Sequence, residues 1–244
     1  MAPYLPIYYV LFYNSFMSAA RKVHPSRHKC LIYEGDPSEQ LPVIVPLLRE
    51  GLRDNWRCLY IGSPQMVSMI EAALRSAGTD VVHETKRGSL VLSSERNLLS
   101  DGTFDPRLML DGLRHLIDTA VGDGFKGLCA TGDMSWELAH DRNFERLLEY
   151  EALLEQLFQN RPLRGICQYH RDLVPAQAVR DALMTHRSAF IGSVLSIANP
   201  FYTPPEVLLS ARTDVAKRVE WMCQQVIRTA TAQTRPHRRV SLAR

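Results

Sequence analysis

The sequence predicts an α/β fold, a three-layer arrangement in which a mostly parallel sheet carries helices on both faces. Short apolar runs alternate along the chain with longer segments whose apolar residues recur at helical spacing. The runs around Cys30, Cys58, Cys129 and Cys167 are apolar without alternation, which is typical of strands buried on both faces. Glycine ends three of these runs, as expected where a strand turns toward a helix.

Each element in the first half follows from a local pattern. The first strand, 29–34, ends at Gly35, and the helix after it, 38–53, has Ser38 as its expected N-cap. Pro42 and Pro46 are expected to bend or shorten the start of this helix. Next come a strand over 57–61, an amphipathic helix over 65–77 closed by a glycine, and strands over 80–83 and 90–93.

Helices again separate strands in the second half. The predicted elements are a helix over 106–121, a strand over 127–131, a helix over 143–159, a strand over 163–169, a helix over 174–186 and a strand over 189–195. Pro175 stands at the start of the last helix, where proline is tolerated. Asn199-Pro200 then marks a turn.

The two ends differ from the body. We divide the chain into an extension 1–27, an α/β domain 28–206, an amphipathic helix 207–231 and a basic tail 232–244 expected to be disordered. The apolar segment 4–16 lacks a basic signal-peptide start and is shorter than the roughly 20 residues that span a bilayer. Three interpretations of this segment stay open. It is a non-core extension with Met17 as the natural start, or a peripheral membrane or partner-binding segment, or an extra strand.

The segment 207–231 carries apolar residues at steps of three, four or seven: Leu208, Val215, Val219, Met222 and Val226. This spacing predicts one amphipathic helix. It either packs on the parent domain or forms a short coiled coil that dimerises the chain or links it to a signalling partner.

Charge and cysteine content narrow the function class. Residues 28–206 hold 18 basic against 24 acidic residues, whereas 207–244 hold 8 against 2. An acidic body argues against nucleic acid bound across it, and membrane binding is not expected. The five cysteines show no zinc spacing and no CxxC pair, which indicates buried thiols and a reducing cytoplasm.

The first strand, turn and helix occupy the position of a phosphate-binding P-loop, but the motif is degenerate. A working loop needs GxxxxGK[ST], and here only Gly35 remains. Glu39-Gln40-Leu41 stand where Gly-Lys-Ser/Thr would be, so Glu39 would repel a phosphate. No GxSxG or HExxH motif is present either. We therefore predict no ATP hydrolysis and no enzymatic activity.

Metal and cofactor binding are not expected from the local patterns. His24, His28 and Cys30 form H-x3-H-x-C, but the first two lie in the lead segment, so we predict no metal site and no cofactor. Asp133 with Glu137 four residues later can hold a cation, and Asp133 equally suits a helix cap.

Short motifs from His28 to Glu206 resemble the MEDS domain, a sensory domain of methanogens and methylotrophs. The motifs are His28 with Cys30-Leu31-Ile32-Tyr33, LREGL at 48–52, Cys58-Leu59-Tyr60-Ile61, GDMSW at 132–136, Glu149-Tyr150-Glu151, Cys167-Gln168-Tyr169 and Asn199-Pro200-Phe201-Tyr202. The resemblance implies a divergent RecA/KaiC-like fold with a decayed nucleotide loop, and a sensory role toward hydrocarbon derivatives or other small organic molecules. Family members are fused to kinase, anti-sigma or DNA-binding parts.

Two positions depart from the family pattern. An acid often follows the CQY motif, where this chain has His170, and an Arg is frequent where this chain has Cys129. If those family residues touch the ligand, the signal recognised here differs.

We therefore expect a sensory or regulatory domain that binds a small organic signal at the carboxyl ends of its strands, where α/β sheets bind ligands. The predicted ligand-binding residues are Tyr33, Glu34, Gly35, Ser63, Thr131, Gly132, Asp133, Trp136, Gln168, Tyr169 and Asn199. The expected partners are a kinase, an anti-sigma factor or a DNA-binding protein, with a homodimer through 207–231. The alternatives are a RecA-like nucleotide-binding ATPase and an anti-sigma-type interaction module without a ligand.

Overall fold

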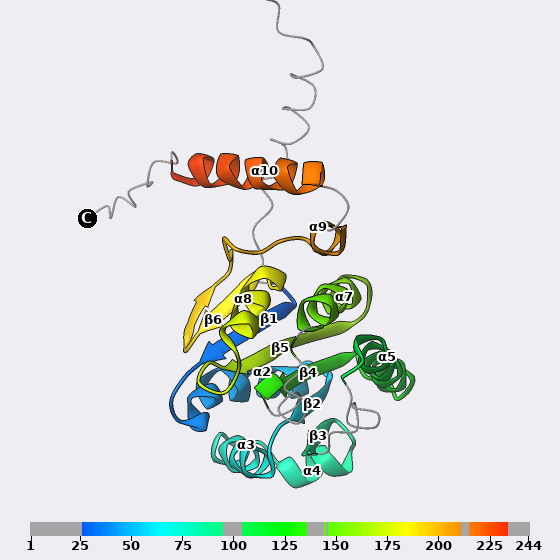
Figure 1. Ribbon diagram of the computed structural model, residues 1–244. Coiled ribbons are helices and arrows are strands. Elements are labelled where there is room, and N and C mark those ends of the chain that lie inside the picture. The colour runs from blue at the N-terminus through cyan, green and yellow to red at the C-terminus, as the bar shows by residue number, and fades with distance from the viewer. Residues whose placement is uncertain (1–25, 95–103, 136–143, 145, 211–214, 234–244) are drawn as a thin grey trace, which may run out of the picture.

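A computed structural model describes residues 26–94, 104–135, 144, 146–210 and 215–233 of the chain. Within these residues lies a seven-stranded sheet with the order β3-β2-β4-β5-β1-β6-β7 (Figure 1). The strands are β1 His28–Tyr33, β2 Arg57–Ile61, β3 Leu90–Ser93, β4 Leu128–Asp133, β5 Leu163–His170, β6 Ser188–Ile191 and β7 Val194–Ser196. Neighbouring strands run parallel except β6 and β7, which pair antiparallel.

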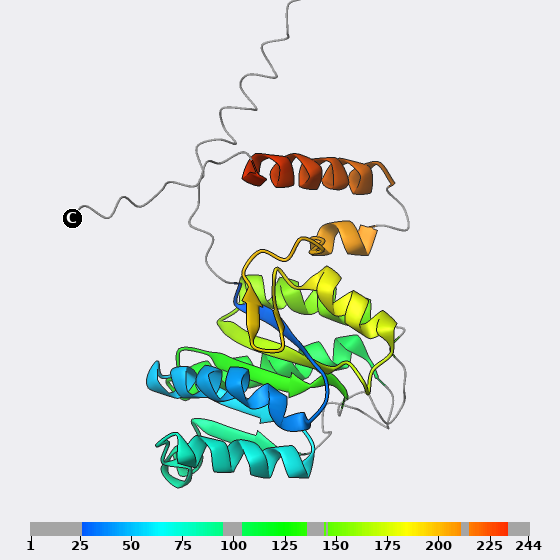
Figure 2. The same ribbon diagram turned by 90° about the vertical axis from the view of Figure 1, so that its left-hand side faces the viewer.

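Helices cover both faces of the sheet. They are η1 Pro37–Gln40, α2 Leu41–Arg53, α3 Pro64–Ser76, α4 Val81–Lys86, α5 Pro106–Gly122, α7 Leu147–Asn160, α8 Ala176–Thr185, α9 Pro205–Ser210 and α10 Val215–Gln233. Apolar side chains of α2, α3 and α4 pack on one face, and those of α5, α7 and α8 pack on the other. Figure 2 shows the sheet between these two helix layers. The three-layer α/β architecture predicted from the sequence is confirmed.

Strand register brings the polar strand ends together. Tyr33 at the end of β1 pairs with His170 at the end of β5. Asp133 at the end of β4 pairs with Gln168 of β5. Because the strands are parallel, these residues all lie at the carboxyl edge of the sheet.

Two predicted strands and one predicted helix cap differ in the structure. The segment 80–83 is not a strand but the start of α4, because the Asp80 side chain accepts a hydrogen bond from the His83 amide and caps a helix. The predicted strand 189–195 is a hairpin of β6 and β7, turned at Gly192, whose positive φ of 55° suits glycine. Asp36 rather than Ser38 makes the cap, and it caps the 3-10 turn η1 that precedes α2.

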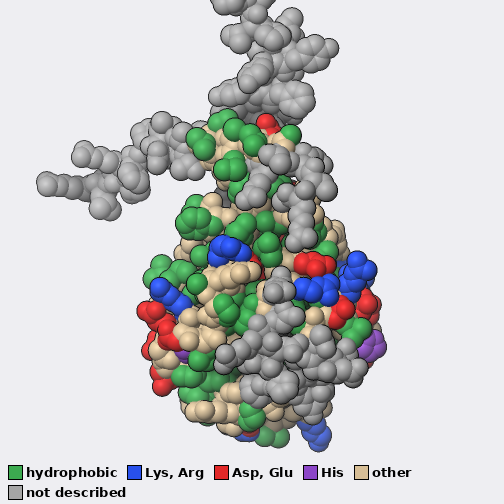
Figure 3. All heavy atoms as spheres, viewed as in Figure 1, with side chains coloured by type: hydrophobic (Ala, Val, Ile, Leu, Met, Phe, Trp, Pro, Cys, Tyr) green, Lys and Arg blue, Asp and Glu red, His purple; other side chains and the backbone are tan. Residues whose placement is uncertain are grey.

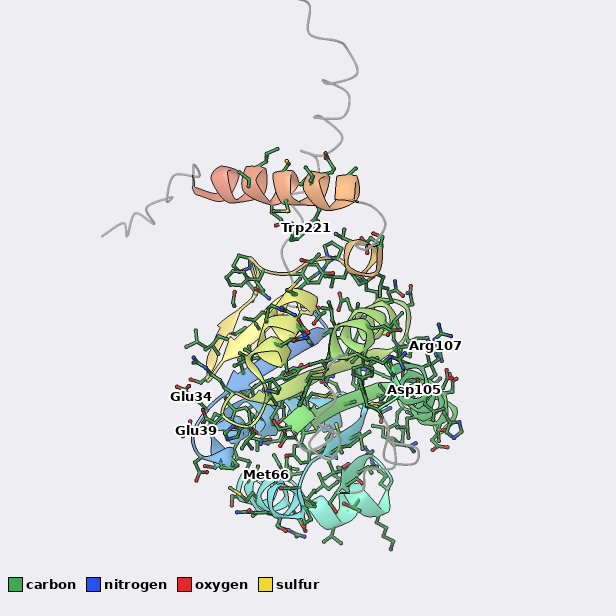
Figure 4. The ribbon with its side chains drawn as sticks, viewed as in Figure 1. Glu34, Glu39, Met66, Asp105, Arg107 and Trp221 are labelled. Carbon is green, nitrogen blue, oxygen red and sulfur yellow. The ribbon has the colours of Figure 1, made fainter. Side chains whose placement is uncertain are left out.

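The segment predicted as one helix over 207–231 contains two helices, α9 and α10. On α10 the side chains of Val219, Met222 and Val226 are 51%, 53% and 70% exposed. Trp221 is less exposed and lies on the side of α10 that faces α9 (Figure 4). Hydrophobic side chains are visible on the surface of α10 in Figure 3. None of the described helices is long and apolar enough to cross a membrane. The predictions for residues 1–25 and 234–244 lie outside the described residues.

Candidate functional site

The carboxyl edge of the sheet carries a buried polar cluster on the face covered by α2 and α3. Side chains alternate between the two faces of a strand, so Tyr33, Tyr60, Thr131 and Gln168 all point to this face. Each of these four side chains is 3% exposed or less. Hydrogen-bonding groups buried this deeply need partners, which makes their pairing informative.

Gln40 occupies the centre of one half of this strand-end cluster. It is fully buried at the end of η1. Counted from Gly35, the spacing GxxxxGK[ST] puts the second P-loop glycine at Gln40 and the lysine at Leu41, one residue later than predicted from the sequence. The Tyr60 hydroxyl donates to Gln40 Oε1 at 3.0 Å, and Gln40 Nε2 donates to the Tyr33 hydroxyl at 3.1 Å. The Gln40 amide therefore joins the hydroxyls of Tyr33 and Tyr60 beside the turn between β1 and α2.

Thr131 and Gln168 form the other half. The Thr131 hydroxyl donates to the Ile166 carbonyl at 2.8 Å, so it must accept the hydrogen bond from Gln168 Nε2 at 2.7 Å. This fixes the orientation of the amide and leaves Gln168 Oε1 as a buried acceptor with no hydrogen-bond partner among the described residues.

His170 presents a second such acceptor on the same face of β5. Its Nε2 donates to the Gly35 carbonyl at 3.0 Å, so a neutral ring carries its lone pair on Nδ1. Nδ1 is buried without a hydrogen-bond partner in the described part of the chain, with the Asp172 carboxylate 4.0 Å away. The ring meets Tyr33 edge-on, with centroids 4.8 Å apart.

Asp133 adds negative charge to the cluster. It is 8% exposed, and its Oδ1 accepts the Ser135 amide at 3.0 Å. Burial, with the nearby Asp133 carboxylate, raises the pKa of the Tyr33 and Tyr60 hydroxyls well above the ordinary tyrosine value. Both phenols therefore stay neutral at physiological pH.

Other predicted residues form the rim or lie elsewhere along the edge. Glu34 is exposed and pairs with Arg171 at 3.2 Å, and Glu34 and Glu39 both lie at the outside of this edge (Figure 4). The Gly35 amide donates to Asp172 Oδ2 at 2.9 Å, and Ser63 caps α3. Trp136 lies outside the described residues.

Tyr169 and Asn199 lie farther from the strand-end cluster, on the opposite face and at the opposite end of the sheet. Tyr169 follows Gln168 directly and so points to the opposite face, where its hydroxyl donates to Glu151. Asn199 lies at the other end of the sheet, because β7 runs antiparallel and returns the chain to the amino ends of the strands. Its side chain donates there to the Leu183 and His186 carbonyls at 2.6 and 2.8 Å.

A small cavity of about 50 Å³ lies between the sheet and helices α5 and α7, on the face opposite to Gln168. Its walls are mainly apolar and include Leu59, Ala130, Tyr150, Phe158 and Cys167. Thr131 and Gly132 also line it. It has room for a very small apolar molecule or a few waters.

Sequence reasoning missed Gln40 and His170 as site residues. The sequence places Gln40 in the degenerate P-loop and His170 at the carboxyl end of a predicted strand, but neither is among the predicted ligand-binding residues. A signal was available for both: each polar residue stands at the carboxyl end of the sheet or in the turn beside it, next to an apolar strand.

The comparisons with known proteins agree with the sequence motifs. The family model of the methanogen/methylotroph, DcmR sensory domain (MEDS) matches residues 27–187. The transcriptional repressor DcmR of Methylorubrum extorquens strain DM4 is 30% identical over 164 residues, which cover 67% of this chain but 59% of the repressor. The flagellar accessory protein FlaH of Methanocaldococcus jannaschii shares 12% identity and a TM-score of 0.45, over 70% of this chain and 76% of FlaH. A family model that covers well over half of the residues, together with the motifs at the strand ends, establishes that this chain belongs to the MEDS family of sensory domains.

Proposed function

We propose that this chain binds a small organic molecule bearing a hydroxyl or amine at the carboxyl edge of its sheet, and relays its presence to a regulatory protein in the cytoplasm. Membership of a sensory family and a relative that is a transcriptional repressor support the regulatory part. The chain spans 59% of that repressor, so any DNA target or output partner belongs to the proposal.

The observation that carries the ligand class is the pair of buried acceptors on β5. Gln168 Oε1 and His170 Nδ1 lack hydrogen-bond partners in the described residues, and the Asp133 carboxylate lies at the paired position on β4. An unsatisfied buried acceptor costs about 1–3 kcal/mol. A ligand that donates hydrogen bonds removes this cost, whereas a ligand without donors does not. Tyr33 and Tyr60 supply aromatic surface beside these acceptors.

The geometry supports signalling rather than catalysis. The P-loop lysine position holds Leu41, and Gln40, at the second glycine position, is already bonded to two tyrosine hydroxyls. Glu39 beside it is exposed and would repel a phosphate. A nucleotide-binding ATPase would need a cation and free amide groups at this turn, so we regard it as the weaker candidate.

The proposed relay is a shift between two conformations of the carboxyl edge. Ligand binding favours the one in which Gln168 and His170 face the donor groups. Strands β4 and β5 link that edge to α7, and the partner contacts are made by α10 or by the edge itself.

A titration with small alcohols, small amines and donor-free haloalkanes of matched size tests the proposal. Binding by calorimetry is expected for the donors, and Gln168→Ala is expected to weaken it by about 1–3 kcal/mol because a ligand donor loses its acceptor. The matched control is Gln65→Ala, since Gln65 is exposed on α3. Donor binding that is unchanged in Gln168→Ala would contradict this site. Haloalkane binding abolished by Ala130→Leu would instead place the signal in the cavity beside Cys167.

A further inference from the structure

Four metal-ligating side chains from four different elements meet beneath α7 and α8. His28 opens β1, Glu151 lies in α7, Cys167 lies in β5, and His186 directly follows α8. His28, Glu151 and His186 are fully buried, and Cys167 is 9% exposed. We call this group the His28–His186 cluster. It lies on the opposite face of β5 from Gln168 and does not depend on the function proposed above.

Four of the six distances between ligand atoms in the His28–His186 cluster fit a tetrahedral ion. Glu151 Oε2 lies 3.5 Å from His28 Nε2, 3.5 Å from His186 Nε2 and 3.8 Å from Cys167 Sγ. Cys167 Sγ lies 3.5 Å from His28 Nε2, and the four ligand atoms all lie within 4.8 Å of one another. Ligands held at about 2.0–2.3 Å around a tetrahedral zinc ion are themselves about 3.3–3.8 Å apart.

Outer hydrogen bonds aim both imidazoles at the centre. His28 Nδ1 lies 3.0 Å from Glu155 Oε2, and His186 Nδ1 lies 2.7 Å from the Ala182 carbonyl. A carbonyl can only accept, so His186 Nδ1 carries the proton and Nε2 carries the lone pair. A histidine ligand held by a carboxylate or carbonyl through its other nitrogen is the usual arrangement around a protein-bound metal.

The ring of His28 also has little freedom. It stacks on Phe158 with centroids 4.1 Å apart and an interplanar angle of 15°. The Tyr169 hydroxyl donates to Glu151 Oε1, which leaves Oε2 directed at the cluster.

Hydrogen bonds alone do not satisfy this arrangement. The lone pair of His186 Nε2 faces the Glu151 carboxylate, so two acceptors oppose each other, and Nε2 has no hydrogen-bond partner in the described residues. A proton on His28 Nε2 can be donated in a hydrogen bond to Glu151, but it leaves His186 Nε2 without a donor. A cation placed between the four atoms satisfies all of them, and two positive charges balance one thiolate and one carboxylate.

We propose that the His28–His186 cluster binds one divalent transition-metal ion, with zinc as the best match to a ligand set of two imidazoles, a thiolate and a carboxylate. Four protein ligands in a buried site are typical of a structural zinc centre, whereas catalytic centres keep a position open. The ion joins β1 and β5 to α7 and α8, which Figure 1 shows side by side. Cys167 also lines the small cavity, so a molecule there would lie against the metal-bound thiolate.

Metal analysis of the full-length protein, reconstituted with Zn²⁺ or Co²⁺ and dialysed, tests the proposal. The expected result is one ion per chain, a thiolate-to-cobalt charge-transfer band, and an unfolding midpoint that rises with Zn²⁺ and falls with a chelator. Cys167→Ser should remove the charge-transfer band, and His186→Gln should lower the affinity for Zn²⁺ by at least tenfold.

Matched controls separate loss of a ligand from loss of the fold. Cys30→Ser changes a buried thiol at the position paired with Cys167, and His83→Gln changes an exposed helix residue; both should retain the metal. A wild-type chain that binds neither Zn²⁺ nor Co²⁺ and shows no change in its unfolding midpoint would overturn the proposal. Unchanged metal content and spectrum in both Cys167→Ser and His186→Gln would overturn it equally.

Discussion

At the scale of single residues, Gln40 fills the turn that a P-loop would use to bind phosphate. Its amide accepts from Tyr60 and donates to Tyr33, and all three side chains are buried. Burying an amide between two phenols costs little only while every partner is present, because each hydrogen bond satisfies a group removed from water.

Replacing Gln40 with Leu is therefore expected to destabilise the fold. Two buried hydroxyls lose their partner, each at a cost of about 1–3 kcal/mol, which urea unfolding should reveal as a lower midpoint. The triple variant with Tyr33→Phe and Tyr60→Phe removes the unpaired hydroxyls as well and should recover part of that loss. Exposed Glu39→Gln serves as the control. A loss below about 0.5 kcal/mol in Gln40→Leu would mean that water replaces the amide.

At the scale of elements, η1, α3, α4 and α5 each begin after a side chain that accepts hydrogen bonds from free amides of the first turn. Asp105 accepts the Arg107 and Leu108 amides at 2.8 and 3.3 Å at the start of α5, and Pro106 occupies the first helical position. Figure 4 shows Asp105 and Arg107 together at this helix end. The hydrogen bonds from these amides, with the charge of Arg146 nearby, lower the pKa of the Asp105 carboxyl.

The lowered pKa of Asp105 predicts a pH-dependent contribution from this cap. A carboxyl whose pKa falls on folding stabilises the fold above its unfolded pKa, and this contribution is lost as pH falls through the lower folded pKa. Asp105→Ala should therefore lower the unfolding midpoint at pH 7, and the difference from wild type should narrow in acid. Asp111→Asn, an exposed substitution within the same helix, should leave the midpoint nearly unchanged. A difference that is constant across pH would show that the charge makes no contribution.

Helix α10 presents an exposed apolar stripe formed by Val219, Met222 and Val226. Of the two sequence hypotheses for this region, packing on the parent domain leaves this stripe unexplained, whereas a dimer through α10 would bury it. Val226→Glu is expected to shift the chain toward a monomer in light scattering at micromolar concentration. Gln224→Lys places a charge on the other side of the helix and should have no such effect. Identical masses for wild type and Val226→Glu would exclude the stripe as the contact.

At the scale of the whole molecule, the distribution of charge and the topology of the sheet restrict which ligands can bind at the carboxyl edge. The carboxyl edge of the sheet carries the acidic residues Glu34, Glu39 and Asp133, whose negative charges repel a phosphate. Two helix layers cover both faces of the sheet, and the small cavity lies beneath one of them.

We therefore predict that magnesium-ATP neither turns over nor stabilises the protein. Phosphate release should remain at the level of a heat-inactivated sample, and the unfolding midpoint should not move at millimolar ATP, because a ligand that does not bind the native state cannot stabilise it. Turnover that disappears in Asp133→Ala would contradict this prediction and revive the nucleotide-binding hypothesis.

Most strands and helices and the acidic body could be predicted from the sequence, because these depend on local periodicity and composition. Apolar runs without alternation located β1, β2, β4 and β5, and the strand-end rule located Thr131, Asp133 and Gln168 at one edge. The two mistaken strands have equally local causes: Asp80 caps a helix start, and Gly192 turns a hairpin. At 80–83 the apolar run is too short to decide between helix and strand.

Which side chains meet could not be predicted from the sequence. The one-residue step between Gln168 and Tyr169 sends them to opposite faces, and the antiparallel return of β7 carries Asn199 to the far end of the sheet. The His28–His186 cluster combines residues of β1, α7, β5 and the end of α8, so no short sequence motif predicts it. Contacts between residues so far apart in sequence depend on strand order and helix packing, which local patterns do not encode.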